Sequence, residues 1–163
     1  MKSCLILTGG KLNLAFARSF LEKEHFDKVI AVDGGLESAE ALGITPDYIV
    51  GDFDPVSGEV VERFRNLPFI VWEQHKPEKN ETDTELARSR ALTLGCEKLV
   101  FLGATGGRLD HMLGNLHALY ACLEKGIDAS LVDTQNRIYL LDQGKTFYRK
   151  TLWGKYVSFL PYT

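Results

Sequence analysis

The sequence predicts an α/β protein: a mainly parallel sheet with flanking helices, followed by the start of a C-terminal antiparallel β domain that we expect to be truncated. Apolar runs of strand length alternate with longer amphipathic stretches over most of the 163 residues, which is typical of βαβ units. Gly43, Gly95 and Gly126 follow stretches of helical character, where a left-handed helix end favours glycine. From residue 135 the chain changes to short apolar segments between glycine turns.

The individual elements follow from these patterns in chain order. The short apolar runs predict strands at 4–8, 28–32, 48–50, 69–72, 99–102 and 129–132. The amphipathic stretches between them predict helices at 14–24, 36–42, 60–66, 84–94 and 112–125. We therefore divide the chain into an α/β domain, 1–134, and a partial β domain, 135–163.

Composition excludes several classes of function. A net charge of -3 leaves no basic field of the kind that holds a nucleic-acid backbone, so we expect no nucleic-acid partner. No apolar run reaches the length that crosses a bilayer, and the first one is too short for a signal peptide. The three cysteines lie in or beside apolar runs without metal-ligand spacing, which favours buried thiols in a reducing compartment. We expect a cytoplasmic protein without a membrane segment.

Five acidic residues follow strands or begin helices, where open α/β sheets bind ligands. Asp33 ends the run KVIAV, Asp52 and Asp54 follow YIVG, Asp83 begins a helix, and Asp110 comes after LVFL and a glycine loop. Carboxylates that converge on one edge repel one another unless a cation lies among them, and this favours a magnesium site. The alternative is a set of turns in which aspartates cap the following helices.

Two glycine-containing turns complete the candidate site. The amides of Gly34 and Gly35 can face an anion at the start of a helix, although a simple tight turn explains them equally well. The segment GATGGRLDH at 103–111 places the hydroxyl of Thr105, the amides of Gly106 and Gly107 and the guanidinium of Arg108 within one turn, and we expect these groups to bind the phosphates of a nucleotide. Arginine suits bidentate phosphate binding, and the alternative is a local ion pair between Arg108 and Asp110.

These motifs in this order resemble the thiamine pyrophosphokinase (thiamine diphosphokinase) family. The resemblance rests on DGG at 33–35, PDYIVGDFD at 46–54, TD at 82–83 and GATGGRLDH at 103–111. It implies magnesium-dependent transfer of pyrophosphate from ATP to thiamine, giving thiamine diphosphate and AMP. It also implies a homodimer, with thiamine held between the α/β domain of one subunit and the β domain of the other.

The resemblance also implies roles for particular residues. The metal ligands would be Asp52, Asp54 and Asp83, with Asp33 and Asp110 close by as further catalytic acids. Phosphates of ATP would contact Thr82, Gly106, Gly107 and the catalytic Arg108. Two positions depart from the family pattern, since Pro55 stands where a serine is usual and Asn80 where an aspartate is usual. The family also continues beyond this length to complete its β domain.

Two other functions fit the same residues. A metal-dependent nucleotide phosphohydrolase would use the acidic cluster to activate water, and would consume ATP without thiamine. A non-catalytic nucleotide-binding module would bind ATP and magnesium without turnover. Either Asp33 or Asp110 could accept the proton of an attacking hydroxyl, and the sequence does not choose between them.

Overall fold

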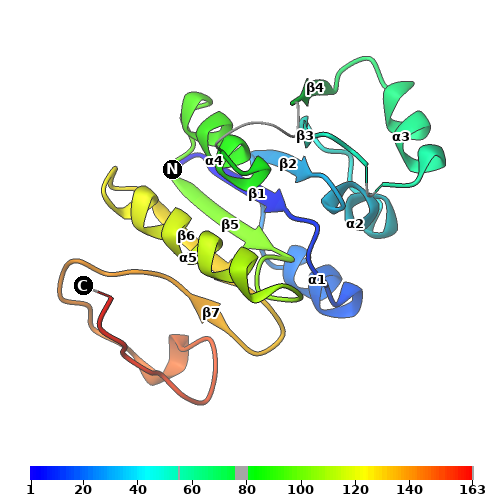
Figure 1. Cartoon of the computed structure of the whole chain (residues 1–163). Coiled ribbons are helices and arrows are strands. Elements are labelled where there is room, and N and C mark those ends of the chain that lie inside the picture. The colour runs from blue at the N-terminus through cyan, green and yellow to red at the C-terminus, as the bar shows by residue number, and fades with distance from the viewer. Residues whose placement is uncertain (55, 76–80, 163) are drawn as a thin grey trace.

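The computed structural model describes residues 1–54, 56–75 and 81–162, and it forms three layers with a seven-stranded sheet in the middle (Figure 1). The strand order is β4-β3-β2-β1-β5-β6-β7. All neighbouring pairs are parallel except β6 and β7, which are antiparallel. The strands are β1 (Ser3–Leu7), β2 (Lys28–Val32), β3 (Tyr48–Gly51), β4 (Val71–Gln74), β5 (Lys98–Leu102), β6 (Asp128–Val132) and β7 (Arg137–Ile138).

Five α-helices connect the parallel strands and cover both faces of the sheet. They are α1 (Leu14–Leu21), α2 (Gly35–Leu42), α3 (Gly58–Arg65), α4 (Asp83–Thr93) and α5 (Leu109–Leu123). Strand β1 shows how the sheet serves two cores, because its successive side chains point to opposite faces. Leu5 and Leu7 pack with α1, α2 and α3, whereas Cys4 and Ile6 pack with α4 and α5. The continuous apolar runs in the sequence reflect strands that are buried on both faces.

The order of the strands creates a switch point between β1 and β5. The chain builds outward from β1 to β4 and then returns to place β5 on the other side of β1. Connections leave β1 and β5 toward opposite faces there, which opens the crevice where such sheets bind ligands. The backbones after β1 and β5 touch, since a Cβ atom on Gly10 would lie 2.0 Å from the carbonyl oxygen of Gly103. Only glycine permits this approach.

The predicted α/β architecture is confirmed, and each strand and helix predicted within residues 1–134 has a counterpart within a few residues. One difference affects the candidate site. The pattern predicts that the last helix begins at residue 112, whereas it begins at Leu109, because Arg108 has the extended backbone of a helix N-cap. Asp110 therefore lies in the first turn of α5, not in the preceding loop.

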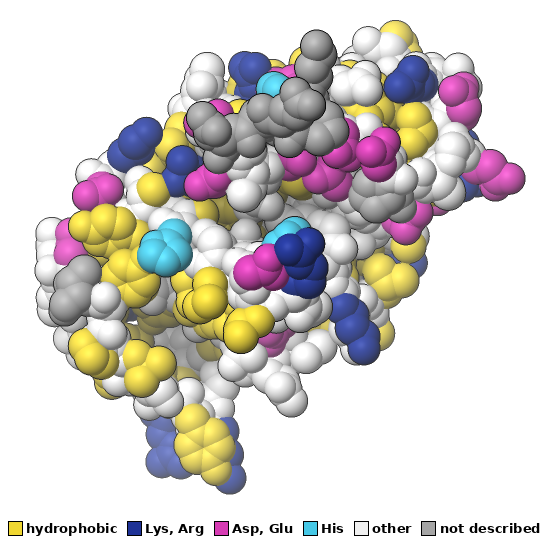
Figure 2. Space-filling model, in the orientation of Figure 1, with side chains coloured by type: hydrophobic (Ala, Val, Ile, Leu, Met, Phe, Trp, Pro, Cys, Tyr) yellow, Lys and Arg dark blue, Asp and Glu magenta, His cyan; other side chains and the backbone are white. Residues whose placement is uncertain are grey.

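The C-terminal segment, residues 139–162, differs most from expectation. Beyond the two residues of β7, its described part contains the short 3-10 helix η1 (Arg149–Thr151) and no strand, although two apolar stretches predicted strands. Those stretches have no neighbouring strand to supply ladder hydrogen bonds. Figure 2 shows hydrophobic side chains gathered over this part of the molecule. The large exposed ones are Leu141, Tyr148, Trp153, Tyr156, Val157, Phe159, Leu160 and Tyr162.

The C-terminal segment still contacts helices of both layers. Trp153 packs edge-on against Phe20 of α1, with ring centroids 5.9 Å apart. Tyr162 stacks on Tyr120 of α5 and its hydroxyl lies 3.0 Å from Nδ1 of His117. In the described part of the chain, none of the helices combines the length and the apolar character needed to span a membrane.

Candidate active site

Asp33 is the centre of the acidic side of the crevice. It follows β2 with a φ of 45°, a left-handed conformation that is uncommon for residues other than glycine and that aspartate adopts more readily than most. Its Oδ1 atom accepts the backbone amide of Asp52 at 3.1 Å. Gly51 has a φ of 142°, a conformation that other residues rarely adopt, and a Cβ atom there would lie 1.8 Å from this Oδ1 atom, so both features favour glycine. The sequence GDFD thus folds around the carboxylate of Asp33.

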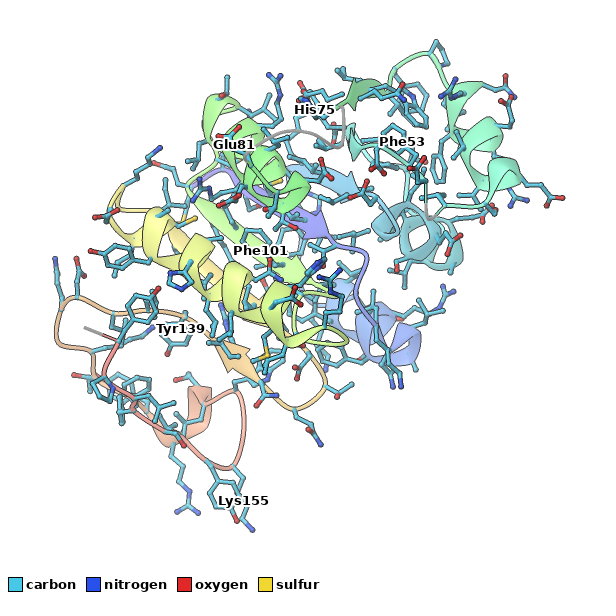
Figure 3. All side chains as sticks on the ribbon, viewed as in Figure 1. Phe53, His75, Glu81, Phe101, Tyr139 and Lys155 are labelled. Atoms are coloured by element: carbon cyan, nitrogen blue, oxygen red, sulfur yellow. The ribbon has the colours of Figure 1, made fainter. Side chains whose placement is uncertain are left out.

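Asp52 and Asp54 lie in the loop that follows β3. Between them Phe53 also has a positive φ, 67°, and its buried ring packs edge-on against Trp72 at 5.2 Å. Figure 3 labels Phe53 in this region, between β3 and the helices α2 and α3. The carboxylate of Asp52 accepts the amide of Asp54 at 3.1 Å, and Asp54 is exposed. The buried phenylalanine holds two aspartates at the surface of the crevice.

Helix α4 brings a fourth acid, Asp83, to Asp33. Its N-cap is Thr82, whose Oγ1 accepts the amide of Glu85 at 3.2 Å, while the Glu85 carboxylate accepts the amide of Thr82 at 2.7 Å. This capping box fixes the start of the helix, where Asp83 is half-buried. Burial raises the pKa of Asp33 to about 7, with further contributions from hydrogen bonding to Asp83 and from the charges of Asp83 and Asp52.

The donor atoms on the acidic side are of the chemical type that magnesium binds. Asp52, Asp54 and Asp83 offer carboxylate oxygens, the ligands that this ion prefers. Burial is the main cause of the raised pKa of Asp33, and the charges of Asp83 and Asp52, which a cation would offset, add to it. Within residues 1–54, 56–75 and 81–162, no three acidic, histidine or cysteine side chains are already arranged to hold a metal ion. Binding would therefore require these side chains to reorient toward the ion.

Glycine turns, called the glycine side below, form the rest of the crevice next to the acids. Gly34 is the N-cap of α2 and has no side chain to cap it, and a Cβ atom on Gly35 would lie 2.0 Å from the carbonyl oxygen of Leu7. The N-terminus of α2 is thus pressed against the end of β1, beside the switch point. A helix N-terminus of this kind is suited to an anion.

The loop that follows β5, residues 103–108, is held by hydrogen bonds from two neighbours. The buried side chain of Asn115 in α5 donates to the carbonyl oxygen of Ala104 at 2.8 Å. The hydroxyl of Thr105 donates to Oδ2 of Asp133 at 2.6 Å. Gly106 lies against Lys11, while a Cβ atom on Gly107, which has a φ of 98°, would meet open space. The loop is anchored at its start, packs against Lys11 at Gly106 and is open at Gly107.

Arg108 and Asp110 form the local ion pair that was the alternative interpretation of this turn. The Nη2 and Nε atoms of Arg108 donate to the two carboxylate oxygens of Asp110 at 2.6 and 3.1 Å. Both side chains are exposed, and the hydrogen bonds from Arg108 hold the pKa of Asp110 below its ordinary value. The acids thus form two groups: Asp33, Asp52, Asp54 and Asp83 on one side, and Asp110 with its arginine on the other.

Sequence reasoning missed Asp133, which contacts a predicted site residue. It follows the apolar strand β6 and comes next to the glycine loop because β5 and β6 are paired in parallel, with Leu102 opposite Val132. The rule that identified Asp33, an acid directly after a buried strand, applies equally to Asp133. Pro55 and Asn80, the two departures from the family pattern, lie outside the described residues.

Comparison with known proteins identifies the family. A family model described as the catalytic domain of thiamin pyrophosphokinase matches residues 21–131, a range that includes every predicted site residue. The chain belongs to the thiamin pyrophosphokinase family. Thiamine pyrophosphokinase of Bacillus subtilis (strain 168) is 32% identical over 163 residues, which cover 100% of this chain and 75% of that protein.

Solved structures of the thiamin pyrophosphokinase family share the fold. A crystal structure of the Bacillus subtilis thiamine pyrophosphokinase aligns with a TM-score of 0.73 and 30% identity, covering 85% of this chain and 63% of that one. That of Geobacillus thermodenitrificans aligns with a TM-score of 0.68 and 29% identity, covering 84% of this chain and 61% of that one. The chain thus spans less than two thirds of these solved chains, and the family resemblance seen in its motifs is confirmed.

Proposed function

We propose that this chain catalyses the magnesium-dependent transfer of pyrophosphate from ATP to thiamine. The observation that carries the proposal is that the family match covers the acidic cluster and the glycine loop, which the fold places around one switch point. The relatives named thiamine pyrophosphokinase and the shared fold support the same activity. The products would be thiamine diphosphate and AMP.

In this reaction the hydroxyl oxygen of thiamine attacks the β-phosphorus of ATP. The new oxygen–phosphorus bond replaces the bond to the oxygen that bridges the α- and β-phosphates, and AMP leaves with that oxygen. Magnesium would be held by Asp52, Asp54 and Asp83, and when bound it would neutralise charge on the polyphosphate. The protein contributes mainly position and electrostatic stabilisation.

The glycine side of the crevice would bind the phosphates. The amides of Gly34, Gly35, Gly106 and Gly107 would serve as hydrogen-bond donors there, and Arg108 would leave Asp110 to bind the transferring group bidentately. An ion pair with both side chains exposed costs little to exchange for phosphate. The proton of the thiamine hydroxyl would pass to a carboxylate, either Asp33 or Asp110.

Three further properties belong to the same proposal. The protein would be cytoplasmic, as its composition and cysteine placement predict, and homodimeric, as the family resemblance implies. Residues 1–134 would form the domain that binds ATP and magnesium, and residues 135–163 would be part of the domain that binds thiamine. The exposed aromatic side chains of the C-terminal segment support this division, because aromatic surfaces can stack on an aromatic substrate.

The test is a product assay with purified protein, ATP, magnesium and thiamine. We expect thiamine diphosphate and AMP in equal amounts by chromatography, with no product when thiamine or magnesium is left out. Asp33→Asn and Asp110→Asn assayed across pH identify the proton acceptor, since a general base must be deprotonated to act and its loss removes the acidic limb of the rate profile. ATP consumption at the same rate without thiamine would instead support a phosphohydrolase, and nucleotide binding without any turnover would support a binding module.

A further inference from the structure

We propose that Asp133 is a positioning residue for the glycine loop 103–108, and that it acts through the hydroxyl of Thr105 without touching the nucleotide. The inference rests on the proposed function, because it assigns the loop to the phosphates of ATP. It adds a residue that lies beyond the family match, which ends at residue 131. It also changes the role of Thr105 from a phosphate ligand to a tether.

The role of Thr105 follows from its single proton. Its Oγ1 atom lies 2.6 Å from Oδ2 of Asp133, a distance typical of a hydroxyl that donates to a charged carboxylate. A threonine hydroxyl carries one hydrogen, so this hydrogen bond leaves none to donate to a phosphate oxygen. Thr105 therefore serves the loop by holding it to the turn after β6.

Asp133 is itself fixed by the turn that it begins. Its Oδ1 atom accepts the amides of Gln135 at 2.8 Å and Asn136 at 2.7 Å, and the side chain of Asn136 donates to it at 3.1 Å. Burial acts to raise the pKa of Asp133, but the hydrogen bonds from Thr105, Gln135 and Asn136 outweigh it and hold the pKa below its ordinary value. With these donors around it, the carboxylate can stay charged beside an anion-binding loop.

The tether matters because two glycines come directly after Thr105. The start of the loop is fixed by Asn115 at Ala104 and by the close contact between Gly103 and Gly10. Gly106 and Gly107 lose the most conformational freedom when ordered, since glycine has the widest range of backbone conformations. Thr105 is the last side-chain anchor before them. Without the Thr105 anchor, Gly106 and Gly107 would become ordered only when ATP binds. The entropy cost of ordering them would then lower the affinity for ATP.

The experiment combines three variants with one control. Thr105→Val removes the hydroxyl at nearly constant shape, Thr105→Ser retains it, and Asp133→Asn weakens the acceptor while keeping the oxygen that the turn needs. Thr93→Val is the matched control, because the Thr93 hydroxyl donates to a carbonyl oxygen, that of Ser89, near the end of α4. Calorimetric titration with ATP and magnesium gives the affinity, and amide hydrogen exchange reports the order of Gly106 and Gly107.

We expect Thr105→Val to weaken ATP binding about tenfold, the effect of losing one hydrogen bond to a charged group. Exchange at Gly106 and Gly107 should become faster, whereas Thr105→Ser and Thr93→Val should match the wild type in both measurements. Because the two side chains act through one bond, Thr105→Val with Asp133→Asn should be no weaker than Thr105→Val alone. The rise in KM for ATP should exceed the fall in kcat, a division that a loss of stability alone would not produce.

Two results would overturn the inference. One is ATP affinity and glycine exchange in Thr105→Val equal to those of the wild type. The other is an additive loss in the double variant. Both are read from binding and exchange, so they are separate from the proposed function, which fails if the wild-type protein makes no thiamine diphosphate. Hydrogen exchange at Gly106 and Gly107 tests the role of the Thr105–Asp133 hydrogen bond even in a protein that shows no turnover.

Discussion

Both sides of the crevice contain aspartates, but the pKa of the aspartate is raised on one side and lowered on the other. On the acidic side, Asp33 lies near Asp83 and Asp52, and its pKa is raised to about 7 by burial and by these neighbours. On the glycine side, hydrogen bonds from Arg108 lower the pKa of Asp110. On the acidic side carboxylates therefore face other carboxylates, whereas on the glycine side the chain supplies the donors that Asp110 accepts.

The backbone shows the same contrast. The described residues other than glycine with positive φ are Asp33 and Phe53, both on the acidic side. On the glycine side the unusual backbone angles occur at Gly103 and Gly107, where they cost little. The acidic side therefore combines backbone strain with charge repulsion, and its geometry is maintained by the packing of Phe53 on Trp72 and by the hydrogen bond to Asp33.

The largest expected effect comes from neutralising the acidic side. Asp52→Asn and Asp54→Asn should each abolish magnesium-dependent turnover, because each removes a charged ligand from the proposed metal site. Neither should lower the thermal midpoint much, since carboxylates that repel one another do not stabilise the metal-free protein. Activity and thermal unfolding are measured together, with Asp128→Asn as control because this exposed residue begins β6 at the opposite edge of the sheet. Near-normal activity in both variants would remove the metal assignment.

The next effect tests the glycine side. Arg108→Lys keeps the charge but loses the planar pair of donors that now binds Asp110 in two places. If Arg108 binds the reacting phosphate through these two donors, the maximal rate of Arg108→Lys should fall on the order of a hundredfold, which is roughly 3 kcal/mol. The affinity of this variant for ATP should fall by a smaller factor. Steady-state kinetics separate the two parameters. A raised KM at unchanged maximal rate would show that Arg108 binds the ground state only.

A third prediction uses pH to sharpen the contrast. Asp33 has a folded-state pKa of about 7 against an ordinary value of 3.8, so the folded chain retains a proton that the unfolded chain releases. The free energy of unfolding of the metal-free protein should therefore fall as pH rises from about 4 to about 7. Urea unfolding across this range measures the slope. Asp33→Asn should flatten it and Asp128→Asn should not, so equal slopes in wild type and Asp33→Asn would contradict the shift.

The fold was predictable because its signals are local and repeated. The run KVIAV predicts β2, and the glycines after α2, α4 and α5 predict the ends of those helices, without knowledge of any neighbour. The proximity of Asp33 to Asp52 was predictable for the same reason, since the carboxyl ends of parallel strands share one edge. Arg108 and Asp110 lie two residues apart in the sequence, and their ion pair, predicted as the alternative interpretation of this turn, is present in the structure.

The remaining features depend on pairing between distant segments. The hydrogen bond from Thr105 to Asp133 joins residues separated by 28 positions, and it requires the register that places Leu102 opposite Val132. Nothing in the local pattern reveals that register. The separation of Asp110 from the other acids likewise depends on the start of α5 at Leu109, because an earlier helix start places Asp110 where it meets Arg108.

The smallest expected effect compares the threonines of the two sides, Thr82 and Thr105. The sequence assigned both to phosphate, but their hydroxyls differ in the structure. Thr105 donates its proton to Asp133, whereas Thr82 accepts the amide of Glu85 and keeps its proton for another acceptor. Thr82 can therefore cap α4 and donate to a phosphate oxygen at the same time. Thr82→Ala should lower the free energy of unfolding by about 1 kcal/mol through loss of the cap.

The two functions of Thr82 can be separated by Thr82→Asp, which retains an oxygen that accepts the Glu85 amide but has no proton to donate and adds a negative charge. Its stability should match that of the wild type, while its affinity for ATP should fall, because the charge repels phosphate at the site where the hydroxyl is expected to donate. Thr82→Ser should retain both properties. Urea unfolding and calorimetric titration measure the two quantities on the same samples. If Thr82→Asp binds ATP as well as the wild type does, Thr82 is a helix cap only, and the phosphates contact the glycine side of the crevice without it.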